Sequence, residues 1–255
     1  MIPKKIHYCW FGGKPKPKLV EKCIASWHRF CPDYEIIEWN ESNYDVTAHP
    51  YTKSCFERGM WAFLSDYVRL DVVFREGGLY FDTDVELIRD PSQFLENKAF
   101  FAFESSDYVN TGLGFGSVAG HPAVSAMLAE YGRFDGTEAD FKPIGCPTLN
   151  TAALVKMGLE KNGKEQLLGD VLVLPADRMN PLDDVIGRLS VTDNTISIHW
   201  CAKSALKRSD RIRSMFTRPL HRMFGTDLFS RMKRKEKLRG TDKKRHENAA
   251  GTVGP

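Results

Sequence analysis

Two aspartates, Asp82 and Asp84, are separated by one residue within a stretch in which apolar and polar residues alternate. The alternation over Leu79 to Glu86 predicts a strand that places both carboxylates on one face, with Cα atoms about 6–7 Å apart. Such carboxylates repel each other unless a cation or hydrogen-bond donors lie between them. Oxygen ligands suit Mg²⁺ or Mn²⁺, and Mg²⁺ is typically held by one or two carboxylates and a substrate's phosphates. The pair therefore predicts a divalent-metal site, and the alternative is a solvated turn at a strand end.

A second pair of charged residues, Asp66 and Arg69, lies upstream in a segment whose apolar residues recur at mostly helical spacing, from Trp61 to Phe74. Residues three apart are neighbours on one helix face. If the helix packs against the aspartate strand, this carboxylate and guanidinium can bind sugar hydroxyls through charge-assisted hydrogen bonds. The alternative is a surface ion pair, which stabilises a protein little. Gly77-Gly78 is expected to end the helix, because glycine adopts the left-handed C-cap conformation without a Cβ clash.

The combined spacing of these residues resembles the core motif of the DXD-containing glycosyltransferases. It is closest to glycosyltransferase family 32, which includes bacterial capsular-polysaccharide transferases and yeast initiating mannosyltransferases, and the clostridial glucosylating toxins carry a similar motif. The resemblance covers roughly residues 2–202 and is densest over 61–90. The residues that carry it are Ser65, Asp66, Arg69, Gly77, Gly78, Tyr80, Asp82, Thr83 and Asp84.

This resemblance implies an α/β fold: a Rossmann-like, nucleotide-sugar-binding domain of GT-A type with a mixed central sheet. We expect the catalytic domain over 1–202, basic amphipathic helices over 203–239 and a disordered tail over 240–255. The implied activity is that of a metal-dependent, retaining hexosyltransferase. It would move a hexose from a nucleotide-sugar donor, expected to be UDP-linked, to a saccharide or lipid-linked acceptor. The implied context is bacterial surface polysaccharide synthesis.

The resemblance also implies residue roles. A metal ion, Mn²⁺ or Mg²⁺, would be held by Asp82, Asp84 and His199, the last near the end of the catalytic domain and beside a tryptophan. Acceptor-side contacts are expected from Asn110 and Thr111. The implied catalytic residues are Asp66, Arg69, Asp82 and Asp84. The implied donor-binding residues are Tyr8, Trp10, Ser65, Asp66, Arg69, Tyr80, Asp82 and Trp200, with Trp10 stacking on the base and Trp200 covering the departing diphosphate.

The elements that must position these residues can be predicted from periodicity. A strand over Lys4–Trp10, a helix over Lys18–Phe30 and a strand over Tyr34–Trp39 form a βαβ unit, and ligands on such sheets bind beyond the carboxyl ends of the strands. The polar segment 40–50 and the glycine-rich segment 110–116 are predicted as loops. The latter lacks the Lys-Ser/Thr of a phosphate-binding loop, so a flexible or close-packed segment is expected. Further strands are predicted at 100–104, 171–174 and 195–199, and helices at 121–131 and 148–157.

The 255 residues carry a net charge of only +3, but the charge is unevenly placed. Residues 203–246 hold sixteen Lys and Arg against four Asp and Glu, whereas residues 1–202 hold twenty against twenty-eight. Interleaved apolar residues make the basic segment typical of helices that lie on anionic membranes. A competing interpretation, which we do not favour, is that this basic segment binds nucleic acid. A third is that its apolar residues pack on the catalytic domain.

The remaining composition suggests a cytoplasmic protein that is peripheral to the membrane's inner face. No signal-peptide core precedes Trp10 and no run of about 18 apolar residues occurs. The six cysteines show no CxxC spacing and are expected to be reduced. Two alternative functions remain open. One is a haloacid-dehalogenase-type phosphatase, with Asp82 as nucleophile and Asp183-Asp184 as its later acidic pair; the other is a non-catalytic, membrane-associated protein that binds nucleotide sugars.

Overall fold

The computed structural model describes residues 1–134 and 143–202. The chain divides into two compact units, one of residues 1–182 and 190–205 and the other of 183–189 and 206–255. The predicted basic helices over 203–239 and the tail over 240–255 lie outside the described residues. The strands β9 (Leu182–Asp183) and β10 (Arg188–Leu189) pair with each other in a two-stranded sheet. All other described elements belong to the first unit.

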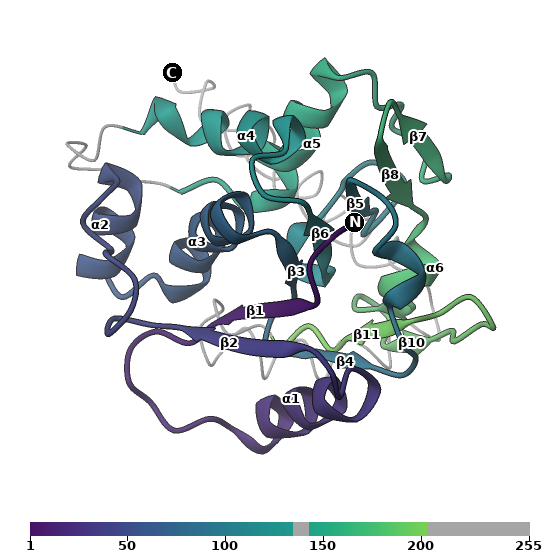
Figure 1. The fold of residues 1–255 in the computed structure, drawn as a ribbon, viewed down its shortest axis with the longest axis horizontal. Coiled ribbons are helices and arrows are strands. Elements are labelled where there is room, and N and C mark those ends of the chain that lie inside the picture. The colour runs from purple at the N-terminus through teal and green to yellow at the C-terminus, as the bar shows by residue number, and fades with distance from the viewer. Residues whose placement is uncertain (135–142, 203–255) are drawn as a thin grey trace, which may run out of the picture. The chain divides into compact units, whose positions relative to one another are not determined.

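The first unit is built on a seven-stranded sheet with the order β2-β1-β3-β6-β5-β8-β7 among the described residues (Figure 1). β1 is parallel to β2 and β3, and β5 is parallel to β8, whereas β6 is antiparallel to both of its neighbours. This arrangement confirms the predicted α/β class and the mixed central sheet. The strands are β1 (Lys5–Cys9), β2 (Glu35–Trp39), β3 (Gly78–Tyr80), β5 (Ala99–Ala102), β6 (Phe115–Ser117), β7 (Gln166–Leu168) and β8 (Val171–Leu174).

The amino-terminal βαβ unit forms as the alternating pattern predicts. β1 and β2 pair in parallel from Lys5 opposite Glu35 to Cys9 opposite Trp39, and the helix between them, α1, spans Lys18–Phe30. The chain leaves β1 at the carboxyl edge of the sheet. Trp10 therefore lies at this edge, where the Trp10 N–H donates to the Trp39 carbonyl at 2.9 Å.

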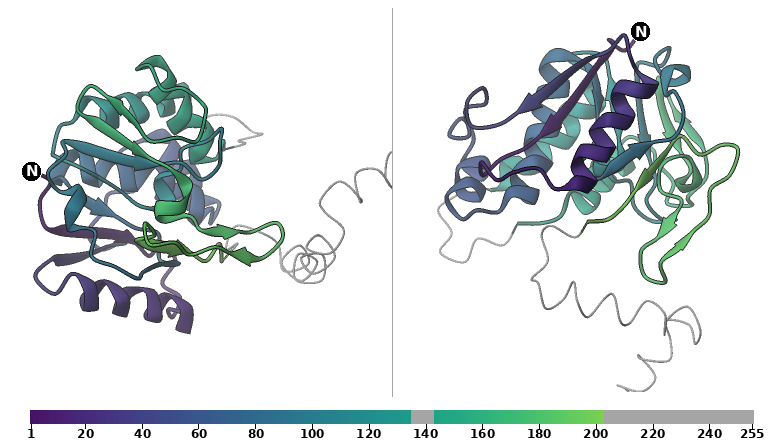
Figure 2. Two further views of the ribbon diagram at one scale, coloured as in Figure 1. Left: turned by 90° about the vertical axis from the view of Figure 1, so that its right-hand side faces the viewer. Right: turned by 90° about the horizontal axis from the view of Figure 1, so that it is seen from below.

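Helices cover both faces of the sheet (Figures 1 and 2). α1 lies on one face, where its Trp27 packs with Phe81 and Phe100 in one core. A second core on the other face contains Phe101 and Phe115, whose rings stack 5.6 Å apart. Successive residues of β5 thus enter opposite cores, and burial of each such side chain contributes about 1.5–3 kcal/mol. The helices of the second face are α2 (Pro50–Glu57), α3 (Trp61–Glu76), α4 (Pro122–Ala129) and α5 (Cys146–Lys156).

The continuous strand predicted over Leu79–Glu86 is wrong, because the chain breaks into two strands that belong to different sheets. β3 ends at Tyr80, and β4 (Val85–Leu87) pairs antiparallel with β11 (Ser197–His199). Between them the Val85 N–H donates to the Asp82 carbonyl at 2.9 Å, which closes a turn. Asp82 and Asp84 therefore sit in this turn, and the alternation of a strand does not set their directions.

The glycine-rich segment is close-packed, in agreement with the expectation of a flexible or close-packed segment. It forms a short 3₁₀ turn, η2 (Thr111–Leu113), and then the central strand β6. An added Cβ at Gly116 would meet the Leu79 side chain at 2.5 Å and that of Phe100 at 2.6 Å, so side chains on both neighbouring strands require glycine there. The helix α2 and the strand β7 were not predicted. Gly77 ends α3 as expected, with a positive φ of 66°.

The remaining short elements connect these layers and contribute little to the site. They are η1 (Ser92–Phe94), η3 (Glu130–Arg133) and α6 (Ala176–Met179). In the part of the chain that the structure describes, no helix combines the length and apolar character needed to cross a bilayer.

Candidate metal centre and its buried network

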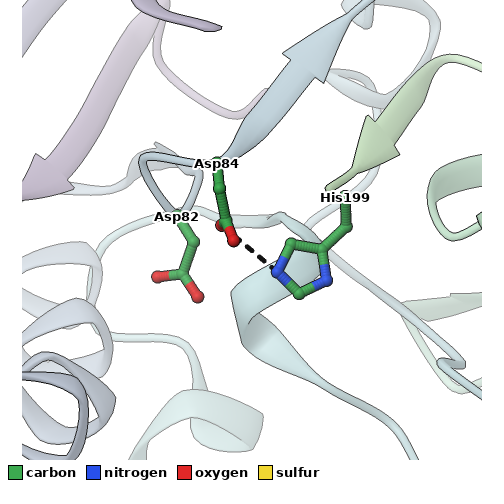
Figure 3. A group of neighbouring side chains, drawn as sticks. All are labelled: Asp82, Asp84 and His199. Carbon is green, nitrogen blue, oxygen red and sulfur yellow. Dashed lines mark ion pairs between the residues drawn. The ribbon is translucent and has the colours of Figure 1, made fainter. Parts of the chain in front are cut away.

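Three side chains from two segments distant in the sequence converge at the β3–β4 turn. Asp82 and Asp84 come from the turn itself, and His199 is the last residue of β11, whose pairing partner is Val85 of β4 (Figure 3). Their ligand atoms all lie within 4.8 Å of one another. Two carboxylates and one imidazole are ligands that suit Mn²⁺ and also accept Mg²⁺. The donor set therefore fits the predicted divalent ion.

Asp84 is held by groups on both of its carboxylate oxygens. His199 Nε2 lies 3.2 Å from Oδ1, and the Ala202 N–H donates to Oδ2 at 2.7 Å. Burial alone would raise the pKa of Asp84, but the His199 hydrogen bond and charge outweigh it, so the pKa is lowered. Burial likewise opposes protonation of His199, yet the hydrogen bond to Asp84 raises the His199 pKa well above its usual value. Both pKa shifts thus favour the ionised forms of Asp84 and His199 in the absence of a metal ion.

Arg69 joins the two aspartates of the predicted motif. Its Nη2 lies 3.0 Å from Asp66 Oδ1 and 2.9 Å from Asp82 Oδ1, and the guanidinium stacks on the Tyr80 ring at 5.0 Å. The side chain is only 3% exposed, so this pair is not on the surface. Nε and Nη1 also donate, to the Ser65 carbonyl at 3.1 Å and the Cys146 Sγ at 3.5 Å.

These contacts give Arg69 a structural role. Every guanidinium nitrogen donates to a protein group, so the side chain positions carboxylates, and its predicted contact with sugar hydroxyls stays a prediction. Ser65 serves the same network, because its Oγ accepts from Arg69 Nη2 at 3.2 Å. Tyr80 belongs to the same network, because it is 1% exposed and its hydroxyl donates to Asp82 Oδ1 at 3.0 Å; its predicted contact with the donor stays a prediction.

Asp66 is buried beside the start of α5. The Cys146 N–H, in the first turn of that helix, donates to Asp66 Oδ2 at 3.2 Å. Burial raises the pKa of Asp66 to about 6; the Arg69 charge opposes this rise and the Asp82 charge adds to it. Burial similarly raises the pKa of Asp82, against the attraction of Arg69. The network therefore holds two carboxylates close together with one guanidinium between them.

The predicted acceptor-side residues, Asn110 and Thr111, follow β5 and open η2. Asn110 Nδ2 donates to Glu104 at 2.7 Å, and its Oδ1 accepts from the Gly112 N–H at 2.7 Å. Asn110 remains partly exposed and can contact a ligand. Thr111 is fully buried, and its Oγ1 accepts from Asn150 Nδ2 at 2.8 Å, so it differs from the predicted contact with an acceptor.

Trp10, which is predicted to stack on the base of the donor, directly follows β1. Trp10 is partly exposed, its Nε1 donates to the Lys14 carbonyl at 2.7 Å, and Lys16 Nζ lies 5.8 Å from the ring centre. Tyr8 is buried, and its hydroxyl donates to Glu38 at 2.6 Å, which differs from the predicted donor contact. Burial, together with Glu38, raises the pKa of Tyr8.

Trp200 lies next to the candidate metal ligands. Its backbone N–H donates to the Asp84 carbonyl at 2.9 Å, and its Nε1 donates to Glu86 at 2.8 Å. Lys22 Nζ lies 5.1 Å from the Trp200 ring centre and 2.7 Å from Glu86. The ring is partly exposed and can still cover a ligand at the metal site.

Three residues of this site carried no signal in the sequence: Cys146, Gly112 and Cys201. Cys146 has no motif, yet it contacts Asp66 and Arg69. An added Cβ at Gly112 would overlap Asp82 Oδ2 and lie 2.9 Å from Arg69 Nη1. Cys146 and Gly112 act through contacts between segments distant in sequence, which local patterns do not report, whereas Cys201 contacts His199 two residues away.

Replacement of Gly112 with Ala is expected to lower the rate of sugar transfer by about 100-fold, because a shift of about 1 Å in a catalytic carboxylate has that effect. The overlap would push Asp82 away from Arg69. Initial rates measured at saturating Mn²⁺ test this. Gly132→Ala is the matched control, since an added Cβ there meets nothing within 4 Å. Equal rates for wild type and Gly112→Ala would show that Asp82 is not placed by this contact.

Two sequence comparisons find relatives, a family of capsular polysaccharide synthesis proteins and a mannosyltransferase. Residues 1–126 match the family described as "Capsular polysaccharide synthesis protein". A curated relative is inositol phosphoceramide mannosyltransferase 3 of Schizosaccharomyces pombe (strain 972 / ATCC 24843), 28% identical over 139 residues. That alignment spans 52% of this chain and only 38% of the mannosyltransferase, well under half of its length. These matches confirm the predicted resemblance, and the family match includes the Asp66–Asp84 motif but ends before His199.

Two solved structures are similar to this chain at low identity. One is "PaToxG Glycosyltransferase", with 19% identity, coverage of 61% of this chain and 69% of that chain, and a TM-score of 0.49. The other is "crystal structure of a glycosyltransferase involved in the glycosylation of the major capsid of PBCV-1", with 13% identity, coverage of 82% and 98%, and a TM-score of 0.46. Because both TM-scores are below 0.5, we base no conclusion on these two likenesses.

Proposed function

We infer that this chain, whose residues 1–126 match capsular polysaccharide synthesis proteins and which is similar to a mannosyltransferase, is a metal-dependent glycosyltransferase. The observation that carries this proposal is the convergence of Asp82, Asp84 and His199 within 4.8 Å, backed by a buried Arg69. This arrangement suits a nucleotide-sugar donor, whose diphosphate brings negative charge next to the carboxylates. A cation is then required, since the carboxylates and the diphosphate would otherwise repel each other.

In this proposal, different side chains bind the metal, position its ligands and cover the diphosphate. Asp84, His199 and Asp82 would hold Mn²⁺ or Mg²⁺, which supplies Lewis-acid stabilisation of the departing nucleoside diphosphate. Arg69 and Tyr80 keep Asp82 in place by hydrogen bonds at 2.9 and 3.0 Å, so little reorganisation is needed during the reaction. Trp200 is placed beside Asp84, where it can cover the diphosphate and exclude water.

The sugar and the base would bind between this centre and β1. Asp66 is 8% exposed and accepts hydrogen bonds from Arg69 and Cys146, so it can bind a sugar hydroxyl only through its small exposed part. Trp10 offers a partly exposed ring at the carboxyl end of β1 for stacking on a base, with UDP as the proposed carrier. Asn110 is the proposed acceptor contact on the opposite side of Asp82.

We further propose that the reaction retains the anomeric configuration. The carboxylates of the network, Asp66 and Asp82, are both paired with Arg69 and are poorly placed to act as covalent nucleophiles. In the proposed reaction the acceptor hydroxyl attacks the anomeric carbon on the face that the diphosphate leaves, and its proton passes to a departing phosphate oxygen. The acceptor would be a saccharide or a lipid-linked saccharide of a bacterial surface polysaccharide.

The proposed location is the cytoplasmic face of the membrane, where lipid-linked acceptors are available. This rests on the basic composition of the segment 203–246, which lies outside the described residues. The phosphatase alternative is less well supported, because Asp82 Oδ1 is bound by both Arg69 and Tyr80 instead of being available as a nucleophile. A non-catalytic binding protein would show no donor turnover at all.

The experiment that tests the proposed function is an assay of donor hydrolysis and transfer with a panel of nucleotide sugars. Wild-type protein is incubated with Mn²⁺, with Mg²⁺ or with EDTA, and released nucleoside diphosphate is measured. We expect turnover of at least one nucleotide sugar with Mn²⁺ and its loss in EDTA. Turnover that persists unchanged in EDTA would refute the metal requirement. Absence of turnover across the panel, combined with hydrolysis of a phosphomonoester, would favour the phosphatase.

A further inference from the structure

We propose that Cys201 is a positioning residue that fixes the imidazole of His199 for metal binding. Cys201 Sγ lies 3.5 Å from His199 Nδ1, the ring nitrogen opposite the one that faces Asp84. Histidines that bind a metal almost always donate their second ring N–H to a neighbouring acceptor, and loss of that acceptor weakens metal binding. In this chain the group placed at that second nitrogen is the Cys201 sulfur. The inference rests on the proposed metal role of His199.

The hydrogen-bond directions around the sulfur are consistent with this role. The Cys201 thiol has a single proton, and its Sγ lies 3.6 Å from the His199 carbonyl, which can only accept. A thiol that donates its proton to that carbonyl leaves a sulfur lone pair free to accept from Nδ1–H, and this is the arrangement that the proposal assigns. Binding of a cation at Nε2 would release to solvent the proton that Nε2 shares with Asp84, while Nδ1 keeps its own proton. This is the tautomer that binds a metal through Nε2.

The backbone of Cys201 adopts an unusual conformation next to this contact. Its φ is +50°, and it is the one non-glycine residue with a positive φ among residues 1–134 and 143–202. Such a conformation is sterically unfavourable for a residue with a Cβ, and it persists where the surrounding structure requires it. Here the reversal brings the Ala202 N–H to Asp84 Oδ2 at 2.7 Å. One strained residue thus sets contacts to two candidate metal ligands.

The geometry also excludes the alternative that Cys201 is itself a ligand of the same ion. Its sulfur contacts Nδ1, whereas Asp84 is 3.2 Å from Nε2, on the other side of the ring. Of the six cysteines, all of which lie in described residues, five are buried and Cys201 alone is partly exposed. A reagent in solution can therefore reach this thiol selectively.

The test compares Mn²⁺ binding to wild type, Cys201→Ala and Cys201→Ser, with free Mn²⁺ measured by electron paramagnetic resonance. We expect Cys201→Ala to weaken Mn²⁺ binding by about tenfold, because Nδ1–H loses its acceptor. Both variants keep a Cβ at the strained position, but only Cys201→Ser keeps an acceptor for Nδ1–H. The Mn²⁺ affinity of Cys201→Ser is therefore expected to stay within about threefold of wild type. Thermal unfolding of the metal-free variants checks that the fold is retained.

Two further measurements separate positioning from a general structural effect. In the Mg²⁺-bound protein, the ¹⁵N spectrum of the His199 ring is expected to show a protonated Nδ1 that is protected from exchange in wild type and Cys201→Ser but not in Cys201→Ala. Alkylation of wild type with iodoacetamide, located at Cys201 by peptide mass spectrometry, is expected to weaken Mn²⁺ binding without any mutation.

The outcomes distinguish this inference from the proposed function. If wild type and Cys201→Ala bind Mn²⁺ equally, the role of Cys201 is refuted and the metal site stands. If Cys201→Ser loses as much affinity as Cys201→Ala, the hydrogen bond to Nδ1 is not the cause and the inference is again refuted. If wild type binds no divalent ion, the metal site itself is refuted, and the inference falls with it.

Discussion

Replacement of Asp84 with Asn is expected to lower the rate of sugar transfer by about 10³-fold, which corresponds to about 4 kcal/mol of lost transition-state stabilisation. Asn keeps the shape of the side chain but removes the negative charge that would bind the cation. It also weakens the contact with His199 Nε2, now 3.2 Å from Oδ1. Mn²⁺ affinity should therefore fall together with the rate, and both are measured on the same preparation.

A matched control for this variant is Asp33→Asn. Asp33 is exposed and pairs with Lys4 next to the start of β2, at the opposite edge of the sheet from the site. Its replacement removes one negative charge and should leave both the rate and the Mn²⁺ affinity unchanged, because exposed ion pairs contribute little. If Asp84→Asn transfers sugar as fast as wild type, the ion is not held by Asp84 and the proposed centre is wrong.

Replacement of Arg69 with Met is expected to reduce the free energy of unfolding by about 3–5 kcal/mol, because it leaves Asp66 and Asp82 without their shared cation. Methionine has a similar length, so the loss is chiefly one of charge and hydrogen bonds. Arg75→Met is the control on the same helix. Arg75 is about half exposed and pairs with Asp71 at 3.1 Å, and its loss should cost no more than about 1 kcal/mol.

The effect of Arg69→Met should depend on pH in a defined direction. The folded-state pKa values of Asp66 and Asp82 are already raised, and loss of the guanidinium raises them further. A carboxyl whose pKa is raised by folding reduces stability as the pH rises through its folded value. The difference between wild type and Arg69→Met is therefore expected to be smaller at pH 5 than at pH 8. Urea unfolding at both pH values measures it.

Neutralising one of the two carboxylates gives a second check on this explanation. The double variant Asp66→Asn with Arg69→Met should recover part of the lost stability, since only one buried carboxylate then lacks a partner. If the double variant is no more stable than Arg69→Met alone, the loss comes from packing and not from uncompensated charge. Transfer is expected to be lost in both variants, because Asp82 is no longer held.

The sequence alone determined which residues could do chemistry and most of the elements that carry them. Asp82, Asp84, Asp66 and Arg69 stand out by type and spacing, and the periodicity of α1 and α3 and the alternation of β1 were sufficient to place the first βαβ unit. These signals are local: they come from side chains a few residues apart, and the backbone periods of helix and strand convert such spacings directly into faces.

Only the tertiary structure decided how these residues are used. The predicted strand through the two aspartates breaks into a turn, because β4 leaves the central sheet to pair with β11. That pairing joins positions more than a hundred residues apart and brings His199 to Asp84. The burial of Arg69, and its use in holding carboxylates, depends on α5, whose Cys146 contacts the guanidinium. Contacts of this kind depend on three-dimensional packing between distant segments, which no local pattern of residues encodes.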